Sequence, residues 1–435
     1  MKQKNIFILI ALILLASLSW FAFSLYTWLS KTQISYHISP EGKVELVASS
    51  TDGQSVVSVN SLVSNILNQS AASSSVQIDQ TTVKASGLVL PKGVAALPDG
   101  RLIVIEKKGT VKLIGLDDKI TDIFNIPDVD VSGEAGLIGL ALDPNFKQNN
   151  KIYLFYTYHN QEGELFNKLV SYDLLSTLTN ATATSTATST EPDKVFAPLA
   201  FRNDQILIDR IPAGYSNNAG TLAFGPDNNL WILTGDAGKA ILAQDNQSLA
   251  GKILRVTTTG QAPTDNPNKD SIIYASGLRL PMGLAWAKVN RKLTGFVSEV
   301  GNNGYDEVNI LAPGANYGWP ATSGCSSEDG RFSDPVICSN NKVWGPSGLT
   351  LINSKTASSS LIMSTANSKA LITFEINRNF ASTSPVVDYG AMLTGYGRLG
   401  GVVNIGEVLY VWTNNRDGRN SFEASDDRLI RLDLK

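Results

Sequence analysis

The stretch YSNNAGTLAFGPDNNLWILTGDAGKAILAQDNQSLAGKILRV, residues 215–256, decides the fold. Its short apolar runs predict three strands, Thr221–Phe224, Leu230–Thr234 and Lys252–Val256. The first two runs are separated by Gly-Pro-Asp-Asn-Asn, and such a cluster of turn residues between short apolar runs is typical of antiparallel hairpins. A polar loop that begins with Gly-Asp precedes the third run. This stretch therefore predicts an antiparallel sheet.

Similar pairs of apolar runs recur from Leu90 to the end of the chain. Arg101–Glu106 and Thr110–Ile114 form an early pair, and Gly401–Thr413 with Arg428–Leu432 form the last. No internal stretch has the spacing of a long amphipathic helix. Repeated short strand pairs favour a radially repeated architecture, so we expect an all-β propeller of about six blades.

Composition agrees with a large folded body. The chain has 435 residues, of which 43% are hydrophobic and 17% charged, which is enough for a sizeable core. Its 36 basic and 39 acidic residues nearly cancel, so nothing indicates a nucleic-acid partner. The 36 glycines and 17 prolines fit a turn-rich β chain.

The N-terminus carries a membrane signal. Residues 6–30, IFILIALILLASLSWFAFSLYTWLS, contain no charge and are long enough to span a bilayer as a helix. Lys2 and Lys4 precede them, which predicts a cytoplasmic N-terminus and an extracytoplasmic body. We expect residues 1–31 to form a cytoplasmic tip and a single-pass transmembrane anchor; a cleaved signal peptide is the alternative.

The rest of the chain divides by composition. Residues 32–87 are polar and are expected to form a stalk or a small N-terminal module, with a hairpin over Gln33–Val47. Residues 88–435 are expected to form the propeller. Within it, residues 177–192 are of low complexity and are predicted to be an exposed insertion.

Cys325 and Cys338 lie in one glycine- and serine-rich loop. A disulfide there would stabilise the fold by roughly 3 kcal/mol on the chain-entropy model. The predicted extracytoplasmic location favours this bridge over two unpaired thiols. A zinc site is not expected, because neither His37 nor His159 lies nearby in the sequence.

Several segments follow one another in a specific order. They are LPKGVAALPDGRLIVIEKKGTVKLI at 90–114, GEAGLIGLALDPNF at 133–146, AGTLAFGPDNNLWILTGD at 219–236, AQDNQSLAGKILRV at 243–256, GLRLPMGLAW at 277–286, EVGNNGYDEVNILAPGANYGWP at 299–320, GRLGGVV at 397–403 and TNNRDGR at 413–419. Together they resemble the soluble pyrroloquinoline quinone (PQQ)-dependent sugar dehydrogenases, the glucose/sorbosone dehydrogenase family, over residues 88–435. The resemblance implies a propeller that oxidises the C1 hydroxyl of an aldose to a lactone, with PQQ as hydride acceptor and Ca²⁺ on the quinone.

The resemblance also places the catalytic base. The family's histidine position is Asn217 here, and a carboxamide can orient a hydroxyl but cannot take its proton. Loss of a positioned base typically costs 10²–10⁴-fold in rate. Glu134 aligns with a polar active-site position, and Asp236 follows a strand end; both are expected to be turn or ion ligands rather than bases. His159 is expected to be a solvated loop residue.

Further residues match cofactor positions of the family. Arg279, Lys369 and Arg398 match residues that contact the quinone, whereas Leu280 and Gly400 stand where the family has an asparagine and a second arginine.

Gly301 matches a backbone Ca²⁺ ligand and Asn302 follows it. The acidic motif Asp306, Glu307 and Asn309 is interpreted as loop architecture ahead of metal binding. Arg416, Asp417 and Arg419 are interpreted as propeller closure rather than ligand contacts.

Three functions follow from these observations. The first is a membrane-anchored, PQQ-dependent aldose dehydrogenase of doubtful turnover, because of Asn217. The second is a catalytically silent surface propeller that binds a glycan or a protein, and the third is a Ca²⁺-dependent lactone hydrolase, which rests on fold analogy alone. The oligomeric state is not indicated.

Overall fold

The computed structural model describes residues 32–38, 44–50 and 57–58 near the N-terminus and, from residue 76 on, all but 177–198, 290, 328–329, 354–358 and 377–385. The chain divides into two compact units, Met1–Ser73 and Ser74–Lys435. The first unit contains an antiparallel sheet of β1 (Thr32–Ile38), β2 (Val44–Ser50) and β3 (Val57–Ser58). The β1–β2 pairing agrees with the hairpin expected at Gln33–Val47.

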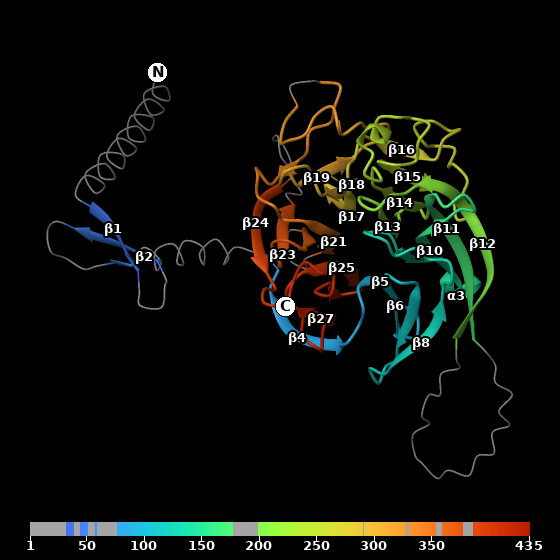
Figure 1. The fold of residues 1–435 in the computed structure, drawn as a ribbon, viewed down its shortest axis with the longest axis horizontal. Helices are drawn as coiled ribbons and strands as arrows, with labels where there is room; N and C mark the ends of the chain where they lie inside the picture. Colours follow the sequence, from blue (N-terminus) through green and yellow to red (C-terminus); the bar gives the residue numbers. More distant parts are fainter. Residues whose placement is uncertain are drawn as a thin grey trace, which may run out of the picture. The chain divides into compact units, whose positions relative to one another are not determined.

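In the described part of the second unit, four-stranded antiparallel sheets form six blades arranged in a ring (Figure 1). From the centre outward, the first three blades are β5 (Pro91–Ala96), β6 (Leu102–Glu106), β7 (Thr110–Ile114) and β8 (Ile120–Asn125); β9 (Leu137–Leu142), β10 (Lys151–His159), β11 (Leu165–Ser176) and β12 (Leu199–Pro212); and β13 (Ala219–Phe224), β14 (Leu230–Thr234), β15 (Lys252–Val256) and β16 (Ile273–Ser276). The six-bladed all-β prediction is confirmed.

The other three blades follow in chain order. They are β17 (Pro281–Val289), β18 (Lys292–Glu299), β19 (Glu307–Leu311) and β20 (Ile337–Cys338); β21 (Pro346–Asn353), β22 (Ser359–Thr365), β23 (Leu371–Ile376) and β24 (Val386–Met392); and β25 (Leu399–Ile405), β26 (Val408–Thr413), β27 (Leu429–Leu434) and β4 (Ile78–Ala85). The run expected as one strand, Gly401–Thr413, is split between β25 and β26. The short helices α3 (Phe146–Asn149) and η1 (Ala240–Ala243) lie between strands.

The ring is closed by a strand from outside the expected propeller. β4 pairs antiparallel with β27 as the outer strand of the last blade, from Leu429↔Ala85 to Leu434↔Ile78. The boundary expected at residue 88 is therefore corrected: the β-rich unit begins at about residue 74, and β4 had been assigned to the polar N-terminal segment. Its burial pattern explains the error, because three of its first four residues are exposed and its sequence, IDQTTVKA, is mostly polar.

Asp427 joins the closed ends of the ring. Its side chain is fully buried, and its Oδ2 accepts a hydrogen bond from the backbone N–H of Leu90, just before the first blade. Its Oδ1 accepts hydrogen bonds from the backbone N–H of Asn415 and from the Thr413 hydroxyl in the last blade. The carboxylate thus cross-links the first and last blades.

The inner strand of every blade carries one extra residue near its start. The register skips this residue in pairs such as Pro91↔Glu106 followed by Gly93↔Ile105, and the same irregularity occurs in β9, β13, β17, β21 and β25. A bulge of this kind re-aims a side chain out of the pleat. In five of the six strands a glycine follows the bulged residue. At Gly283, for example, a Cβ would lie 2.3 Å from the backbone nitrogen of Leu349 in the next blade.

Apolar side chains fill the space between neighbouring blades. One cluster joins Ile103 and Ile105 of β6 to Leu137 of β9 and Leu154 of β10. Another joins Val94 of β5 to other residues at the ring closure, including Tyr410 and Trp412 of β26. The blades are therefore held by continuous packing around the ring as well as by the strand closure.

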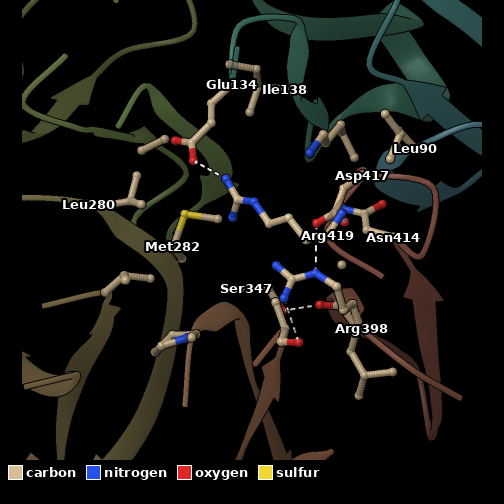
Figure 2. A pocket seen from close by; sticks show the side chains of 18 of the residues that line it. Leu90, Glu134, Ile138, Leu280, Met282, Ser347, Arg398, Asn414, Asp417 and Arg419 are labelled. Carbon is tan, nitrogen blue, oxygen red and sulfur yellow. Dashed lines mark hydrogen bonds and ion pairs between the residues drawn. The ribbon is translucent and has the colours of Figure 1, made fainter. Parts of the chain in front are cut away.

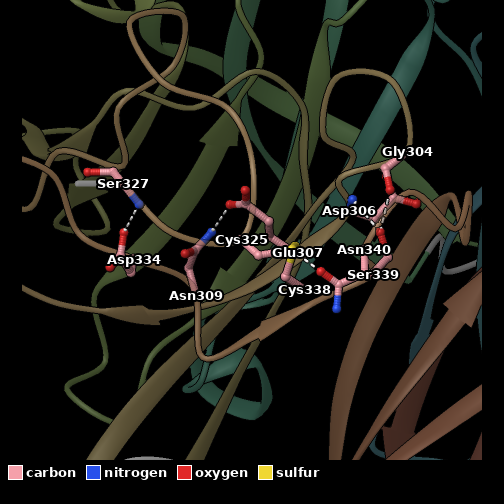
Figure 3. Close-up of a disulfide and its surroundings, with 10 residues drawn as sticks. All are labelled: Gly304, Asp306, Glu307, Asn309, Cys325, Ser327, Asp334, Cys338, Ser339 and Asn340. Carbon is pink, nitrogen blue, oxygen red and sulfur yellow. Dashed lines mark hydrogen bonds between the residues drawn. A yellow bond between two sulfur atoms is a disulfide. The ribbon is translucent and has the colours of Figure 1, made fainter. Parts of the chain in front are cut away.

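A disulfide closes the loop between β19 and β20, and the Asp306 carboxylate joins the segments just before β19 and just after β20 (Figure 3). Cys325 and Cys338 form a disulfide, as the sequence favoured. The buried Asp306 carboxylate accepts backbone hydrogen bonds from Gly301, Trp344 and Gly345. Three backbone donors on one carboxylate support the architectural interpretation of this motif.

Two predictions lie outside the described residues. They are the transmembrane anchor at residues 6–30 and the low-complexity insertion at residues 177–192. Among the residues that the structure does describe, no helix has the length and apolar character needed to cross a bilayer.

We expect Asp427→Asn to destabilise the protein by roughly 1–3 kcal/mol, because the new NH₂ group would face a buried backbone N–H that now has an acceptor. Urea unfolding followed by tryptophan fluorescence measures the change. Asp433→Asn is the matched control in β27: it removes only a partly exposed pair with Arg431 and should cost less than about 1 kcal/mol. Equal effects of the two substitutions would contradict the closing role of Asp427.

Candidate functional site

A cavity of about 420 Å³ opens where the inner strands converge. All six blades contribute to its wall, and its volume is within the range of small-molecule sites. Ile138, Leu280 and Met282 form part of the wall and lie near Glu134, as Figure 2 shows. The cavity therefore offers both an apolar surface and polar groups.

The bulged residue of each inner strand faces this cavity. Five of them are Lys92, Ile138, Met282, Ser347 and Gly400, each directly followed by glycine. Four carry no charge, so Lys92 is the exception among them. The bulge thus places one residue per blade at the centre.

The wall carries an excess of positive charge. The charged side chains on it are six cations and two carboxylates: Lys92, Lys107, Arg279, Arg398, Arg416 and Arg419 against Glu134 and Asp417. Low-dielectric walls lined by one sign of charge focus the field and concentrate ligands of the opposite sign. The cavity is therefore suited to an anionic ligand.

Both carboxylates are already paired with an arginine (Figure 2). The Arg398 Nε donates to Asp417 Oδ2 at 2.7 Å, and the Arg419 Nη2 lies 3.1 Å from Glu134 Oε1. The second pair joins residues 285 positions apart in the sequence, and the Arg419 side chain extends across the cavity to reach Glu134. Its side chain is 60% exposed, so this pair adds little stability.

Arg279 is held by carbonyl oxygens. Its Nη1 lies 3.2 Å from the carbonyl oxygens of both Val300 and Gly301, and its guanidinium lies over the Trp319 ring at 5.8 Å. Among the described residues, no carboxylate forms an ion pair with the guanidinium of Arg279. The carbonyl contacts also place a cation against the Gly301 oxygen, which the resemblance suggests as a Ca²⁺ ligand.

Asn217 lies in the loop between β12 and β13, in the left-handed backbone region at φ 55°. Its backbone N–H donates to Glu134 Oε2 at 2.8 Å and its Nδ2 to Asp236 Oδ1 at 3.0 Å. Asp236 is buried, and its Oδ2 accepts a hydrogen bond from the Trp319 indole at 2.8 Å. These contacts fix the carboxamide, and its Oδ1 accepts no hydrogen bond from any described residue.

The structure brings together only some of the predicted site residues. Glu134, Asn217, Arg279 and Arg398 all line the cavity. Lys369 does not; it is exposed, and its Nζ donates to Asn420 Oδ1 at 3.1 Å.

Asn302 also lies off the cavity wall, and its carbonyl accepts a hydrogen bond from the Tyr305 N–H in a turn. His159, which was expected to be a solvated loop residue, is half-exposed, and its Nδ1 lies 3.2 Å from Asp130. In contrast, Arg416, Asp417 and Arg419, which were interpreted as closure residues, line the cavity.

Lys92 and Lys107 were missed by the sequence reading. The signal for Lys92 was the repeated x-Gly start of the inner strands, visible in Pro91-Lys92-Gly93, Pro281-Met282-Gly283 and Pro346-Ser347-Gly348. Lys107 lies in the turn between β6 and β7, and its Nζ donates to the Gly133 carbonyl at 2.6 Å. No local pattern marks it.

The two lysines affect each other. Burial and the nearby charge of Lys107 lower the pKa of the Lys92 amine to about 8, against the opposing effect of Glu134 and Asp417. Burial also lowers the pKa of Lys107. A lowered pKa means that the charged form of each amine is poorly stabilised, so an anionic ligand near the two lysines would be favourable.

Known proteins share this architecture. An aldose sugar dehydrogenase from Streptomyces coelicolor, whose structure was solved with PQQ bound, superposes with a TM-score of 0.69 at 31% identity, over 83% of this chain and 98% of that one. A putative oxidoreductase (glucose dehydrogenase) from a Thermus species gives 0.69 and 32%, over 81% and 99%.

Curated proteins also match this chain in sequence. Quinoprotein glucose dehydrogenase B of Acinetobacter calcoaceticus is 28% identical over 272 residues, which is 56% of this chain and 53% of that protein. The match to human Hedgehog-interacting protein is 26% over 228 residues, 45% of this chain and 30% of that protein. The match thus spans about half the length or less of these relatives.

A sequence model of the family supplies the assignment. The glucose/sorbosone dehydrogenase model matches residues 88–430, most of the chain and nearly all of the propeller described above. The match includes every strand from β5 to β26 and therefore all the inner strands that bear the cavity. The chain belongs to the glucose/sorbosone dehydrogenase family.

Proposed function

We propose that this protein is an extracytoplasmic, PQQ-dependent aldose dehydrogenase in which proton removal is impaired. The observation that carries the proposal is the cation-rich cavity at the centre of a propeller of this family. The substrate is an aldose whose C1 hydroxyl is oxidised to a lactone. The bound quinone would supply the hydride acceptor.

The residues present fit an anionic quinone. Arg279, Arg398 and Arg416 line the cavity and are anchored by hydrogen bonds to neighbouring carbonyls or carboxylates, so their positive ends are fixed. Fixed guanidinium groups are suited to carboxylates because they offer two donors in one plane. We assign no quinone contact to Lys369, because it lies off the cavity wall.

The same residues do not fit a Ca²⁺ ion as they are arranged. The Gly301 and Val300 oxygens accept hydrogen bonds from Arg279, which is itself a cation. Among the described residues there is no cluster of three or more His, Cys, Asp or Glu side chains that could bind a metal ion. We therefore derive no catalytic step through calcium.

Asn217 would orient the sugar rather than deprotonate it. Asp236 holds its Nδ2, so the Oδ1 is the atom left to accept a hydrogen bond from a substrate hydroxyl. The carboxamide of Asn217 has no basicity near neutral pH. The proton of the C1 hydroxyl must therefore pass to water or to another acceptor that is a weaker base than histidine.

A second function is a surface propeller that binds a ligand without turnover. It is supported by Asn217 at the base position and by the Arg419–Glu134 pair across the cavity. The chain also matches a relative that is named Hedgehog-interacting protein rather than after an enzyme. Binding of a glycan or protein with no oxidation, in both the native chain and a variant with a restored base, would favour this function.

We further propose that residues 6–30 anchor the chain in the membrane with the propeller outside the cytoplasm. The proposal rests on their uncharged composition and on the lysines before them. The disulfide between Cys325 and Cys338 supports it, since structural disulfides persist in oxidising compartments.

We expect Asn217→His to raise sugar oxidation by about 10²-fold or more, because an imidazole beside Asp236 would act as the missing base. The backbone at this position favours the change, since asparagine and histidine are both enriched at positive φ. The measurement is dye-linked oxidation of an aldose panel by the purified chain supplied with PQQ.

Asn217→Gln is the control, because it keeps an amide and should leave the low rate unchanged. Binding of PQQ by the histidine variant is measured in parallel, so that loss of the cofactor is not mistaken for loss of the base. Rapid oxidation by the native chain, or no gain from histidine with PQQ bound, would overturn the impaired-base proposal.

A further inference from the structure

Lys92 and Lys107 form a cationic wall, and neither is among the arginines that we assign to the quinone. Both line the cavity, and both come from the first blade, in β5 and in the turn after β6. The amine of Lys107 donates to one backbone carbonyl, and the Lys92 amine makes no hydrogen bond or ion pair with any described residue. We refer to this pair as the lysine wall.

The carboxylates of the cavity do not neutralise the lysine wall. Glu134 is paired with Arg419, and Asp417 with Arg398. Partly buried cations without a counter-anion are unfavourable unless a ligand supplies one. The low pKa of Lys92 has the same origin: walls that exclude water and a second amine nearby. The lysine wall therefore has charge that the cavity's own carboxylates leave unpaired.

The lysine wall lies where a sugar, rather than the quinone, is expected. Lys107 lies beside Glu134, because its Nζ donates to the carbonyl of the preceding residue, Gly133, at 2.6 Å, and Figure 2 shows Glu134 on the far side of the Arg419 side chain from Arg398. Glu134 accepts the backbone N–H of Asn217, which ties the position of the reacting hydroxyl to that side. A substituent of the bound sugar would therefore point toward Lys92.

We propose that Lys92 and Lys107 bind the carboxylate of an acidic sugar, so that the preferred substrate is a hexuronate or a related sugar acid. This inference rests on the proposed function for the assumption that the ligand is a sugar. The ammonium groups act as point charges and donors to the carboxylate, and no covalent step is involved. The bulge at Lys92 is the structural device that turns this charge toward the ligand.

The test compares glucuronate with glucose by calorimetric titration of the full chain without PQQ. The native protein should bind glucuronate at least tenfold more tightly than glucose at low salt. Lys92→Gln should remove most of that preference, because it weakens glucuronate binding more than glucose binding. Lys107→Gln should reduce it as well, which keeps the test open if one variant folds poorly.

Lys108→Gln is the matched control, since Lys108 adjoins Lys107 but is exposed and off the cavity wall. It should leave the preference intact. Equal affinity for glucuronate and glucose in the native chain, or a preference that survives both cavity substitutions, would overturn the proposal.

A parallel titration with PQQ separates this inference from the proposed function. A glucuronate preference in a chain that does not bind PQQ would support the lysine wall and contradict the dehydrogenase. Binding of PQQ that is weakened tenfold by Lys92→Gln, with no glucuronate preference, would assign the wall to the cofactor and overturn the inference.

Discussion

The pairing of β4 with β27 is the contact on which the rest of the molecule depends. A propeller has a usable centre only if its ring is closed, because each blade delivers a single bulged residue and a few loop residues to the middle. The closing strand comes from the start of the unit and pairs with its last strand, and Asp427 fastens the same junction to the first blade. Opening this junction would separate Lys92 from Arg398 and Asp417, which lie at the two ends of the closed chain.

Closure brings together groups that repel one another. Six cations meet two carboxylates in one cavity, and each carboxylate is taken by an arginine. Hydrogen bonds to carbonyls and carboxylates offset the repulsion at the arginines. At Lys92, burial and the charge of Lys107 lower the pKa of the amine instead. A cavity with this excess of positive charge is suited to an anionic cofactor or substrate and poorly suited to an added metal cation.

The sequence was sufficient for the architecture because each blade repeats a local pattern. Leu230–Thr234, Lys252–Val256 and Thr110–Ile114 were predicted at their observed bounds, since apolar runs between glycine, proline and aspartate turns specify strands locally. β4 was misassigned because an outer strand needs little apolar character. The charged contacts were not predictable for a different reason: the Arg419–Glu134 pair depends on the ring closing over 285 residues. Asn217 was located only through the family resemblance, and Lys92 only once the bulges were known.

The central claim is that the closed ring forms a cavity whose arginines bind PQQ while Lys369 has no part in it. Calorimetric titration of PQQ into the full chain, with Arg398→Gln and Lys369→Gln as paired variants, tests this most directly. We predict micromolar binding by the native protein, at least a tenfold loss with Arg398→Gln and no change with Lys369→Gln. Absence of binding, or equal losses in the two variants, would contradict it.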